Sequence, residues 1–243
     1  MSAATLLMTH MVAFYPDRAA SLQVARGLLD VGCAYLEVQF PFSDPTADGP
    51  DIQAACDGAL KAGFTVSEGF RLVSEIASKA RVPLFIMSYA NLIFTRGVDR
   101  FLGESKEAGA KGVIVPDLPE GYDEGLFSRA GRLGLAAVPV VSPSMKDGRL
   151  AEVLSLQAEY IYATLRTGTT GTRTEIDQDI VRFLSRIRGG KVLGGFGISS
   201  AEQVRAGAPL VHAVVVGSAL VREVARGGDP YGAVKRKVEE LRG

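Results

Sequence analysis

Short apolar runs recur along the chain, and each is followed by a segment with helical spacing. The first run, Leu6–Phe14, is rich enough in apolar residues to be a buried strand. After it, apolar residues recur at intervals of three to four positions, which indicates an amphipathic helix, at Ala20, Val24, Leu28 and Val31. The same pattern predicts eight strands, at residues 6–14, 35–40, 82–87, 112–115, 135–141, 160–164, 191–195 and 211–216.

Every predicted strand is followed by at least one predicted helix. Alternating strands and helices favour a parallel sheet, because each right-handed crossover packs its helix back onto the sheet. Eight such units in 243 residues predict an α/β fold, a closed (β/α)₈ TIM barrel that forms a single domain over residues 1–243. The helices are predicted at residues 17–31, 51–62, 66–80, 98–108, 120–133, 146–156, 176–188, 201–205, 219–226 and 231–241.

An open, doubly wound sheet is the alternative architecture. That fold usually has fewer strands and carries a glycine-rich fingerprint directly after its first strand. Here the first strand ends in Phe14-Tyr-Pro-Asp17, which contains no glycine. The closed barrel is therefore favoured.

A glutamate lies inside the second apolar run. If residues 35–40 form a strand, Glu37 lies on the opposite face from Leu36 and Val38. A buried carboxyl group is costly unless it is paired or protonated, so Glu37 is a candidate for chemistry. Asp48 follows eleven positions later on a Pro/Gly-rich loop. Active sites of such barrels lie at the carboxyl ends of the strands, so we expect Glu37 and Asp48 to form an acid/base pair there.

Each carboxylate also has a structural interpretation. Glu37 could be satisfied by backbone groups or tyrosine hydroxyls without taking part in chemistry. Asp48 precedes Gly-Pro and could simply form a turn.

Three glycine-bearing segments lie in the last third of the chain. They are Gly168-Thr-Thr-Gly171 after the sixth strand, Gly194-Gly-Phe-Gly-Ile-Ser199 at the seventh, and Val216-Gly-Ser218 at the eighth. In many barrels the last two loops and a helix N-terminus bind phosphate through main-chain N–H groups. The three segments together predict a phosphate site.

Composition excludes several other functions. The 27 basic and 27 acidic residues balance, which gives no electrostatic reason to expect nucleic acid or an anionic membrane. Two cysteines and the two histidines, His10 and His212, show no metal-ligand spacing, and no metal site is expected. No signal peptide or membrane span is evident, so we expect a cytoplasmic protein.

Several motifs resemble those of one known family. PFSDPTADGP after Glu37, YANLIF at residues 89–94, PDLP at 116–119, GTTG, GGFGIS and VGSALV follow one another as in the α subunit of tryptophan synthase. The resemblance extends from Glu37 to Val221, and its ten-residue loop is highly specific. It implies a lyase that cleaves indole-3-glycerol phosphate to indole and glyceraldehyde 3-phosphate by a retro-aldol reaction. Indole then passes to a β subunit that carries pyridoxal phosphate (PLP).

The resemblance implies a role for individual residues. Glu37 would move protons to indole C3 and from the substrate hydroxyl, Asp48 would hold the indole N–H, and Tyr162 matches an active-site tyrosine. This subunit would need no cofactor or metal, and it would assemble with the β subunit into a heterotetramer. The implied substrate-binding residues are Tyr89, Thr170, Phe196 and His10, and the implied phosphate-binding residues are Gly171, Gly195, Gly197, Gly217 and Ser218.

Two positions depart from the family pattern. Gln39 stands where the family commonly has glycine, and we expect it to crowd the pocket or to hydrogen-bond Glu37. His10 stands where an apolar aromatic residue is more usual, and we expect it to line the pocket. These departures leave open a catalytically weak α-type subunit that mainly activates the β subunit. Retention of both Glu37 and Asp48 favours the lyase, while His212 is expected to be structural.

Overall fold

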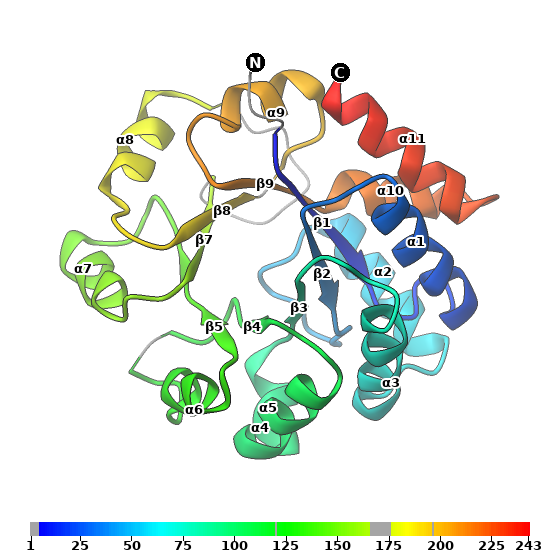
Figure 1. Ribbon diagram of the computed structural model, residues 1–243, viewed down its shortest axis with the longest axis horizontal. Coiled ribbons are helices and arrows are strands. Elements are labelled where there is room, and N and C mark those ends of the chain that lie inside the picture. The colour runs from blue at the N-terminus through cyan, green and yellow to red at the C-terminus, as the bar shows by residue number, and fades with distance from the viewer. Residues whose placement is uncertain (1–4, 120, 166–175, 196) are drawn as a thin grey trace.

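The computed structural model describes residues 5–119, 121–165, 176–195 and 197–243. Its strands form a central ring that is surrounded by helices (Figure 1). All strand pairs are parallel, in the order β5-β4-β3-β2-β1-β9-β8-β7-β6, which confirms the predicted barrel. The strands are β1 Leu7–Val12, β2 Tyr35–Gln39, β3 Leu84–Met87, β4 Gly112–Ile114, β5 Ala136–Val138, β6 Val140–Val141, β7 Tyr160–Thr164, β8 Lys191–Gly195 and β9 Ala213–Val216.

The predicted fifth strand, residues 135–141, is divided in two at Pro139. Its first part, β5, pairs with β4, and its second part, β6, pairs with β7. Pro139 has no N–H to donate to a neighbouring strand, but its carbonyl accepts a hydrogen bond from the Tyr162 N–H at 2.9 Å. The ring is therefore closed here by the continuity of the chain through Pro139.

Local sequence signals account for many of the helix ends. Asp17 caps the first helix by accepting a hydrogen bond from the Ala20 N–H, and Ser200 and Gln203 form a capping box. The helices are α1 Arg18–Asp30, α2 Pro50–Lys61, α3 Val66–Ala77, α4 Ala90–Arg96, α5 Val98–Glu107, α6 Leu126–Leu133, α7 Asp147–Ser155, α8 Gln178–Arg186, α9 Ala201–Gly207, α10 Ser218–Ala225 and α11 Pro230–Arg242.

One helical prediction was wrong at its start, and one helix was missed. The helix expected from residue 120 begins only at Leu126, because Gly121, Glu124 and Gly125 have positive φ angles that a right-handed helix does not accommodate. Helix α4 was not predicted. Its first N–H group, on Ala90, is capped by the side chain of Asp117 from the loop after β4, at 2.9 Å. No residue near α4 in the sequence signals that contact.

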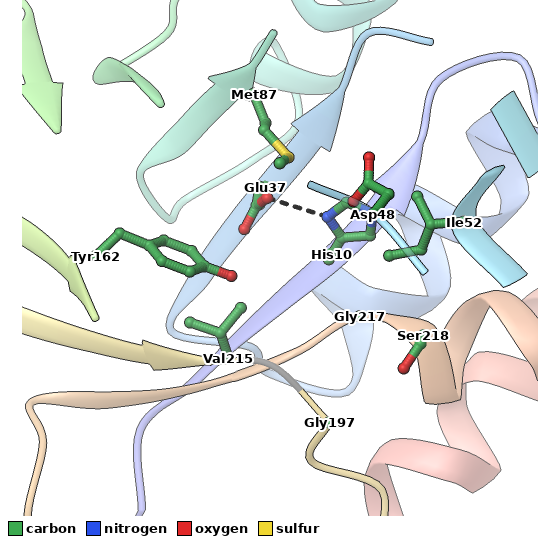
Figure 2. A pocket seen from close by; sticks show the side chains of 10 residues that line it. All are labelled: His10, Glu37, Asp48, Ile52, Met87, Tyr162, Gly197, Val215, Gly217 and Ser218. Carbon is green, nitrogen blue, oxygen red and sulfur yellow. Dashed lines mark hydrogen bonds and ion pairs between the residues drawn. The ribbon is translucent and has the colours of Figure 1, made fainter. Parts of the chain in front are cut away.

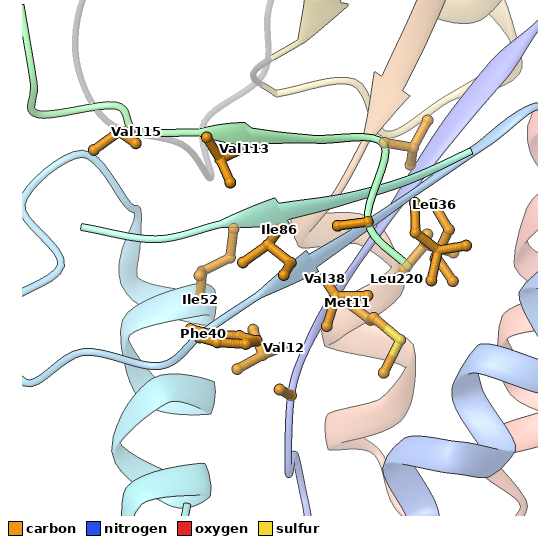
Figure 3. Packing of buried hydrophobic residues seen from close by; sticks show 14 of the residues in the cluster. Met11, Val12, Leu36, Val38, Phe40, Ile52, Ile86, Val113, Val115 and Leu220 are labelled. Carbon is orange, nitrogen blue, oxygen red and sulfur yellow. The ribbon is translucent and has the colours of Figure 1, made fainter. Parts of the chain in front are cut away.

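The alternation predicted for β2 is confirmed. Leu36, Val38 and Phe40 belong to the large core between sheet and helices, where they pack with residues such as Ile86 and Val113 (Figure 3). Tyr35 instead joins the cluster inside the barrel. The interior face of β2 therefore directs Glu37 and Gln39 into the barrel.

The first and last helices pack closely against each other. A Cβ atom added at Gly27 of α1 would lie 2.7 Å from the Tyr231 carbonyl oxygen of α11, so only glycine allows this approach. Among the helices that the structure describes, none is long and apolar enough to cross a membrane.

Candidate active site

The register between β1 and β2 places His10 beside Glu37. The two residues are direct partners on neighbouring parallel strands, and both side chains point into the barrel. His10 is 4% exposed and Glu37 is 1% exposed. The His10 Nδ1 lies 3.1 Å from Glu37 Oε1, as the dashed line in Figure 2 shows. His10 lines the pocket, as the sequence led us to expect, but its contact with Glu37 was not predicted.

The charge on His10 depends on its acidic neighbours. Burial lowers the pKa of His10, because a buried imidazolium loses hydration. The charge and hydrogen bond of Glu37, together with the charge of Asp48, outweigh burial and raise this pKa above its ordinary value. The pair therefore favours a proton on His10 when Glu37 is ionised.

The loop after β2 delivers Asp48 to the same pocket. The Asp48 N–H donates to the Pro45 carbonyl at 3.0 Å, and the Gln53 side chain donates to the Asp48 carbonyl at 2.8 Å. The Asp48 carboxylate accepts hydrogen bonds on Oδ2 from Tyr89 Oη at 2.8 Å and Gln39 Nε2 at 2.7 Å. Gln39 thus bonds Asp48, and not Glu37 as the sequence suggested.

The pKa of Asp48 reflects opposing influences. Burial raises it, the charge of His10 and the hydrogen bonds from Tyr89 and Gln39 lower it, and the charge of Glu37 raises it. The net effect is a pKa above the ordinary value for aspartate. The donors from Tyr89 and Gln39 thus offset part of the cost of keeping this buried carboxylate ionised.

These side chains face a common pocket. Tyr162 approaches Glu37 from the opposite wall, on β7 (Figure 2). Burial, and then the charges of Glu37 and Asp48, raise the pKa of Tyr162 well above its usual value, so this phenol stays protonated at neutral pH. The pocket is lined by His10, Glu37, Asp48, Ile52, Met87, Tyr162, Gly197, Val215, Gly217 and Ser218.

Several buried polar atoms in and beside this pocket have no protein partner. Among the described residues these include Glu37 Oε2, His10 Nε2 and Gln39 Oε1. A buried polar atom without a hydrogen bond costs about 1–3 kcal/mol, so such atoms mark positions where a ligand or water binds. Glu37 and His10 each present such an atom within the pocket, where a ligand would meet both residues.

One rim of the pocket is formed by glycines and the start of a helix. Gly197 follows β8 with a φ angle of 83°, and Gly217 precedes Ser218, the first residue of α10. The N-terminus of α10 presents main-chain N–H groups and the positive end of the helix dipole. Gly217 also lies beside the His10 ring, since an added Cβ atom would be in ordinary van der Waals contact with the His10 Cβ and Cγ at 3.4 Å. The glycine rim and the acidic pair thus meet at His10.

Not every residue singled out in the sequence lines this pocket. Tyr89 is fully buried and reaches the site only through its hydrogen bond to Asp48. Gly195 lies in β8, where an added Cβ atom would meet the Tyr162 hydroxyl at 2.7 Å, so its glycine gives space to that side chain. Thr170, Gly171 and Phe196 lie outside the described residues.

Three apolar residues of the lining were not foreseen. Met87 pairs with Gln39 across β2 and β3, and Val215 belongs to the interior cluster on β9. Strand alternation places both side chains inside the barrel, so this pattern in the sequence could have identified them. Ile52 comes from α2, which follows the acidic loop directly.

The described residues contain no group of three or more His, Cys, Asp or Glu side chains that could hold a metal ion. Cys33 and Cys56 are free and buried, and burial raises the pKa of the Cys56 thiol to about 12. Neither cysteine is therefore a ready nucleophile at neutral pH.

A barrel with two buried carboxyl groups, a protonated tyrosine and a glycine-rich anion rim at one mouth is an acid/base enzyme of the phosphorylated-substrate class. A family model described as "Tryptophan synthase alpha chain" matches residues 2–242. Tryptophan synthase alpha chains from Helicobacter hepaticus and Thermococcus kodakarensis are each 38% identical to the chain. The alignments cover 89% and 86% of this chain, and 84% of each relative. The chain belongs to the tryptophan synthase alpha chain family.

Solved structures agree with this assignment. Mycobacterium tuberculosis tryptophan synthase superposes with a TM-score of 0.90 at 30% identity, over 98% of this chain and 91% of that one. The tryptophan synthase complex from Pyrococcus furiosus gives 0.88 at 33% identity, over 97% of both chains. Members of the family are lyases of tryptophan biosynthesis, and their substrate is indole-3-glycerol phosphate. It needs no cofactor in this subunit, and PLP belongs to its β-subunit partner.

Proposed function

We propose that this chain cleaves indole-3-glycerol phosphate to indole and glyceraldehyde 3-phosphate, with Glu37 as the group that moves protons. The observation that carries this proposal is the buried Glu37 carboxyl, whose Oε2 faces the pocket without a partner among the described residues. The other residue roles given below belong to the same proposal.

The reaction moves one proton, through Glu37, from the C3′ hydroxyl of the substrate to indole C3, and it breaks the C3–C3′ bond. Glu37 gives a proton to indole C3, which turns the ring into an iminium-type electron sink. The C3′ hydroxyl then returns a proton to Glu37, the C3–C3′ bond breaks, and its electron pair moves into the ring as the aldehyde carbonyl forms. Glu37 ends in its starting protonation state, so no other reactant is needed.

Asp48 stabilises the charge that develops on the indole nitrogen. A carboxylate hydrogen-bonded to the ring N–H becomes more effective as that nitrogen becomes positive. Tyr89 and Gln39 hold this carboxylate by 2.8 Å and 2.7 Å hydrogen bonds, so it does not reorganise during the reaction. Both donors also favour the ionised form that this role requires.

The remaining site residues bind the substrate. Gly197, Gly217 and Ser218 contact the phosphate through main-chain N–H groups and the N-terminus of α10. The resemblance alone adds Gly195, which in β8 gives space to Tyr162, and Gly171, which lies outside the described residues. Tyr162 approaches the reacting carbons as a neutral hydroxyl donor. His10 lines the indole pocket, and Tyr89 acts on it through Asp48. Thr170 and Phe196, which lie outside the described residues, are assigned to the indole pocket by the resemblance alone.

The proposed assembly is a heterotetramer with two β subunits, in the cytoplasm, where the indole product is passed on. The related structure from Pyrococcus furiosus is a tryptophan synthase complex, which supports this assembly. The chain would act there as a single domain over residues 1–243.

The test follows indole release from indole-3-glycerol phosphate, first by the isolated chain and then with a β subunit added. Glu37→Gln should lower turnover by about 10²–10⁴-fold, the usual effect of losing a positioned acid/base group. It should leave glycerol 3-phosphate binding unchanged, because the glycine rim is intact. Glu107→Gln, which changes an exposed glutamate on α5, is the matched control.

One result would count against the role of Glu37, and another against the lyase activity. If Glu37→Gln keeps more than a few per cent of activity, Glu37 is not the proton carrier. If the chain activates a β subunit but never releases indole, the second candidate, a regulatory α-type subunit, is supported instead. The specific observation that favours the second candidate is that His10 and Gln39 bond the two acids directly.

A further inference from the structure

We propose that His10 is a positioning residue that shares a proton with Glu37, fixing Oε1 so that Oε2 is the oxygen that exchanges protons with the substrate. This inference rests on the proposed lyase function and adds to it a positioning role for His10.

Three features hold the His10 ring in place. The β1–β2 register makes His10 and Glu37 direct neighbours, with Nδ1 and Oε1 3.1 Å apart. On the other side, Gly217 comes close enough that an added Cβ would be in van der Waals contact with the His10 Cβ and Cγ. The ring is almost fully buried, so it has little room to change rotamer.

The contact makes the two oxygens of Glu37 different. With the shared proton on Nδ1, Oε1 accepts an N–H from His10, whereas Oε2 is buried without a partner among the described residues. The Nδ1–H bond persists when Oε2 gives its proton to C3 and when it takes the hydroxyl proton back. Oε2 therefore keeps its direction through the cycle, which is the condition for efficient proton transfer.

The titratable groups near His10 come from the pocket wall and from the helices packed against β1. Glu37 of β2, Asp48 of the following loop and Tyr162 of β7 face the same pocket. Tyr162 remains neutral, so Glu37 and Asp48 set the field at the imidazole. On α10 and α2, which both pack against β1, Arg222 and Asp51 bond each other at 2.6 Å.

The first experiment needs no turnover. The chain has two histidines, so ¹⁵N-histidine labelling gives two ring signals, and His212→Gln assigns them. His10 should titrate above the ordinary histidine pKa, and His212, lowered by burial and by the charge of Lys191, should titrate below it. Glu37→Gln should lower the His10 midpoint by about one unit or more and leave His212 unchanged. A His10 midpoint that does not move in Glu37→Gln would overturn the pairing.

The second experiment uses activity. His10→Phe removes both ring nitrogens, and kcat should fall about tenfold or more, at the low end of acid/base effects, with KM within about twofold. His10→Asn keeps an N–H near the place of Nδ1 but cannot titrate. It should restore most of kcat while losing the pH limb that belongs to His10. Wild-type kcat and pH profile in both variants would refute the inference.

The two experiments separate this inference from the proposed function. If the wild-type chain releases no indole, the lyase proposal fails, while the histidine titration still decides whether His10 and Glu37 share a proton. If thermal denaturation shows that His10→Phe does not fold, His10→Asn and the histidine titration in Glu37→Gln decide the outcome.

Discussion

Tyr89→Phe tests how the protein keeps a carboxylate ionised in a buried pocket. Tyr89 is fully buried, its hydroxyl donates to Asp48 Oδ2 at 2.8 Å, and the same hydroxyl accepts the Ala47 N–H at 3.1 Å. The substitution removes one atom and leaves the ring stacked on Phe42. Gln39 then remains as the donor to Oδ2.

The magnitude follows from the charge on the acceptor. A hydrogen bond to a charged group contributes about 1.5–3 kcal/mol. Since one pKa unit corresponds to about 1.36 kcal/mol, the pKa of Asp48 should rise by about one to two units. If ionised Asp48 is needed for cleavage, the acid limb of kcat/KM for indole release should move upward by the same amount.

Stability gives a second measurement of the same bond. The folded-state pKa of Asp48 already lies above its unfolded value, so ionised Asp48 lowers stability at neutral pH, and stability rises as pH falls through that folded pKa. Tyr89→Phe should therefore be most destabilising above the folded pKa, as urea unfolding across pH would show.

Tyr231→Phe is the matched control. It removes the same hydroxyl from a bond to Asp30 Oδ2 at 2.9 Å, but that bond is exposed. Exposed polar pairs contribute about 0–1 kcal/mol, so this variant should change little. An acid limb that stays in place in Tyr89→Phe, with a loss of stability no greater than that of Tyr231→Phe, would refute the reasoning.

Three further predictions follow from the packing and charge of other residues. Gly217→Val should weaken glycerol 3-phosphate binding about tenfold or more in calorimetry, a loss of about 1.4 kcal/mol. The reason is that the methyl groups of valine enter the rim beside His10. Unchanged affinity would argue against the phosphate site. Gly27→Ala should destabilise the fold by about 1–3 kcal/mol, since its methyl group meets the Tyr231 carbonyl. Gly103→Ala in α5, where an added Cβ atom meets nothing within 4 Å, should instead gain about 0.5–1 kcal/mol; equal effects of the two alanines would contradict the close approach of α1 and α11. The pKa of His212 is lowered in the folded state, so between that value and the unfolded pKa the unfolded chain binds more protons and stability falls as pH falls. In His212→Gln this decline just below pH 6.5 should be reduced, and an unaltered pH dependence of unfolding would speak against it.

Local periodicity was enough to predict the barrel and the direction of Glu37. Strand alternation depends on adjacent residues, so Leu36 and Val38 determine that Glu37 faces inward. The loop motif likewise indicated that Asp48 belongs with Glu37, and the structure brings both into one pocket.

The partners of these acids could not be predicted in the same way. Gln39 bonds Asp48 because the loop after β2 folds back over the strand and Tyr89 holds it there. The contact between His10 and Glu37 depends on the register of two parallel strands that a helix separates in the chain. No local pattern encodes either arrangement, since each is set by how distant segments pack.

The division of the fifth strand at Pro139 has a consequence for how the barrel opens. Strands β5 and β6 stand at the two ends of the hydrogen-bonded order, whereas β1 lies at its centre, with ladders on both sides. Local opening begins where the fewest hydrogen bonds have to break. Backbone amides beside Pro139 should therefore exchange with solvent deuterium first, and those of β1, β2 and β9 last. Glu37 and His10 therefore lie on strands that stay paired while β5 and β6, across the barrel, open locally.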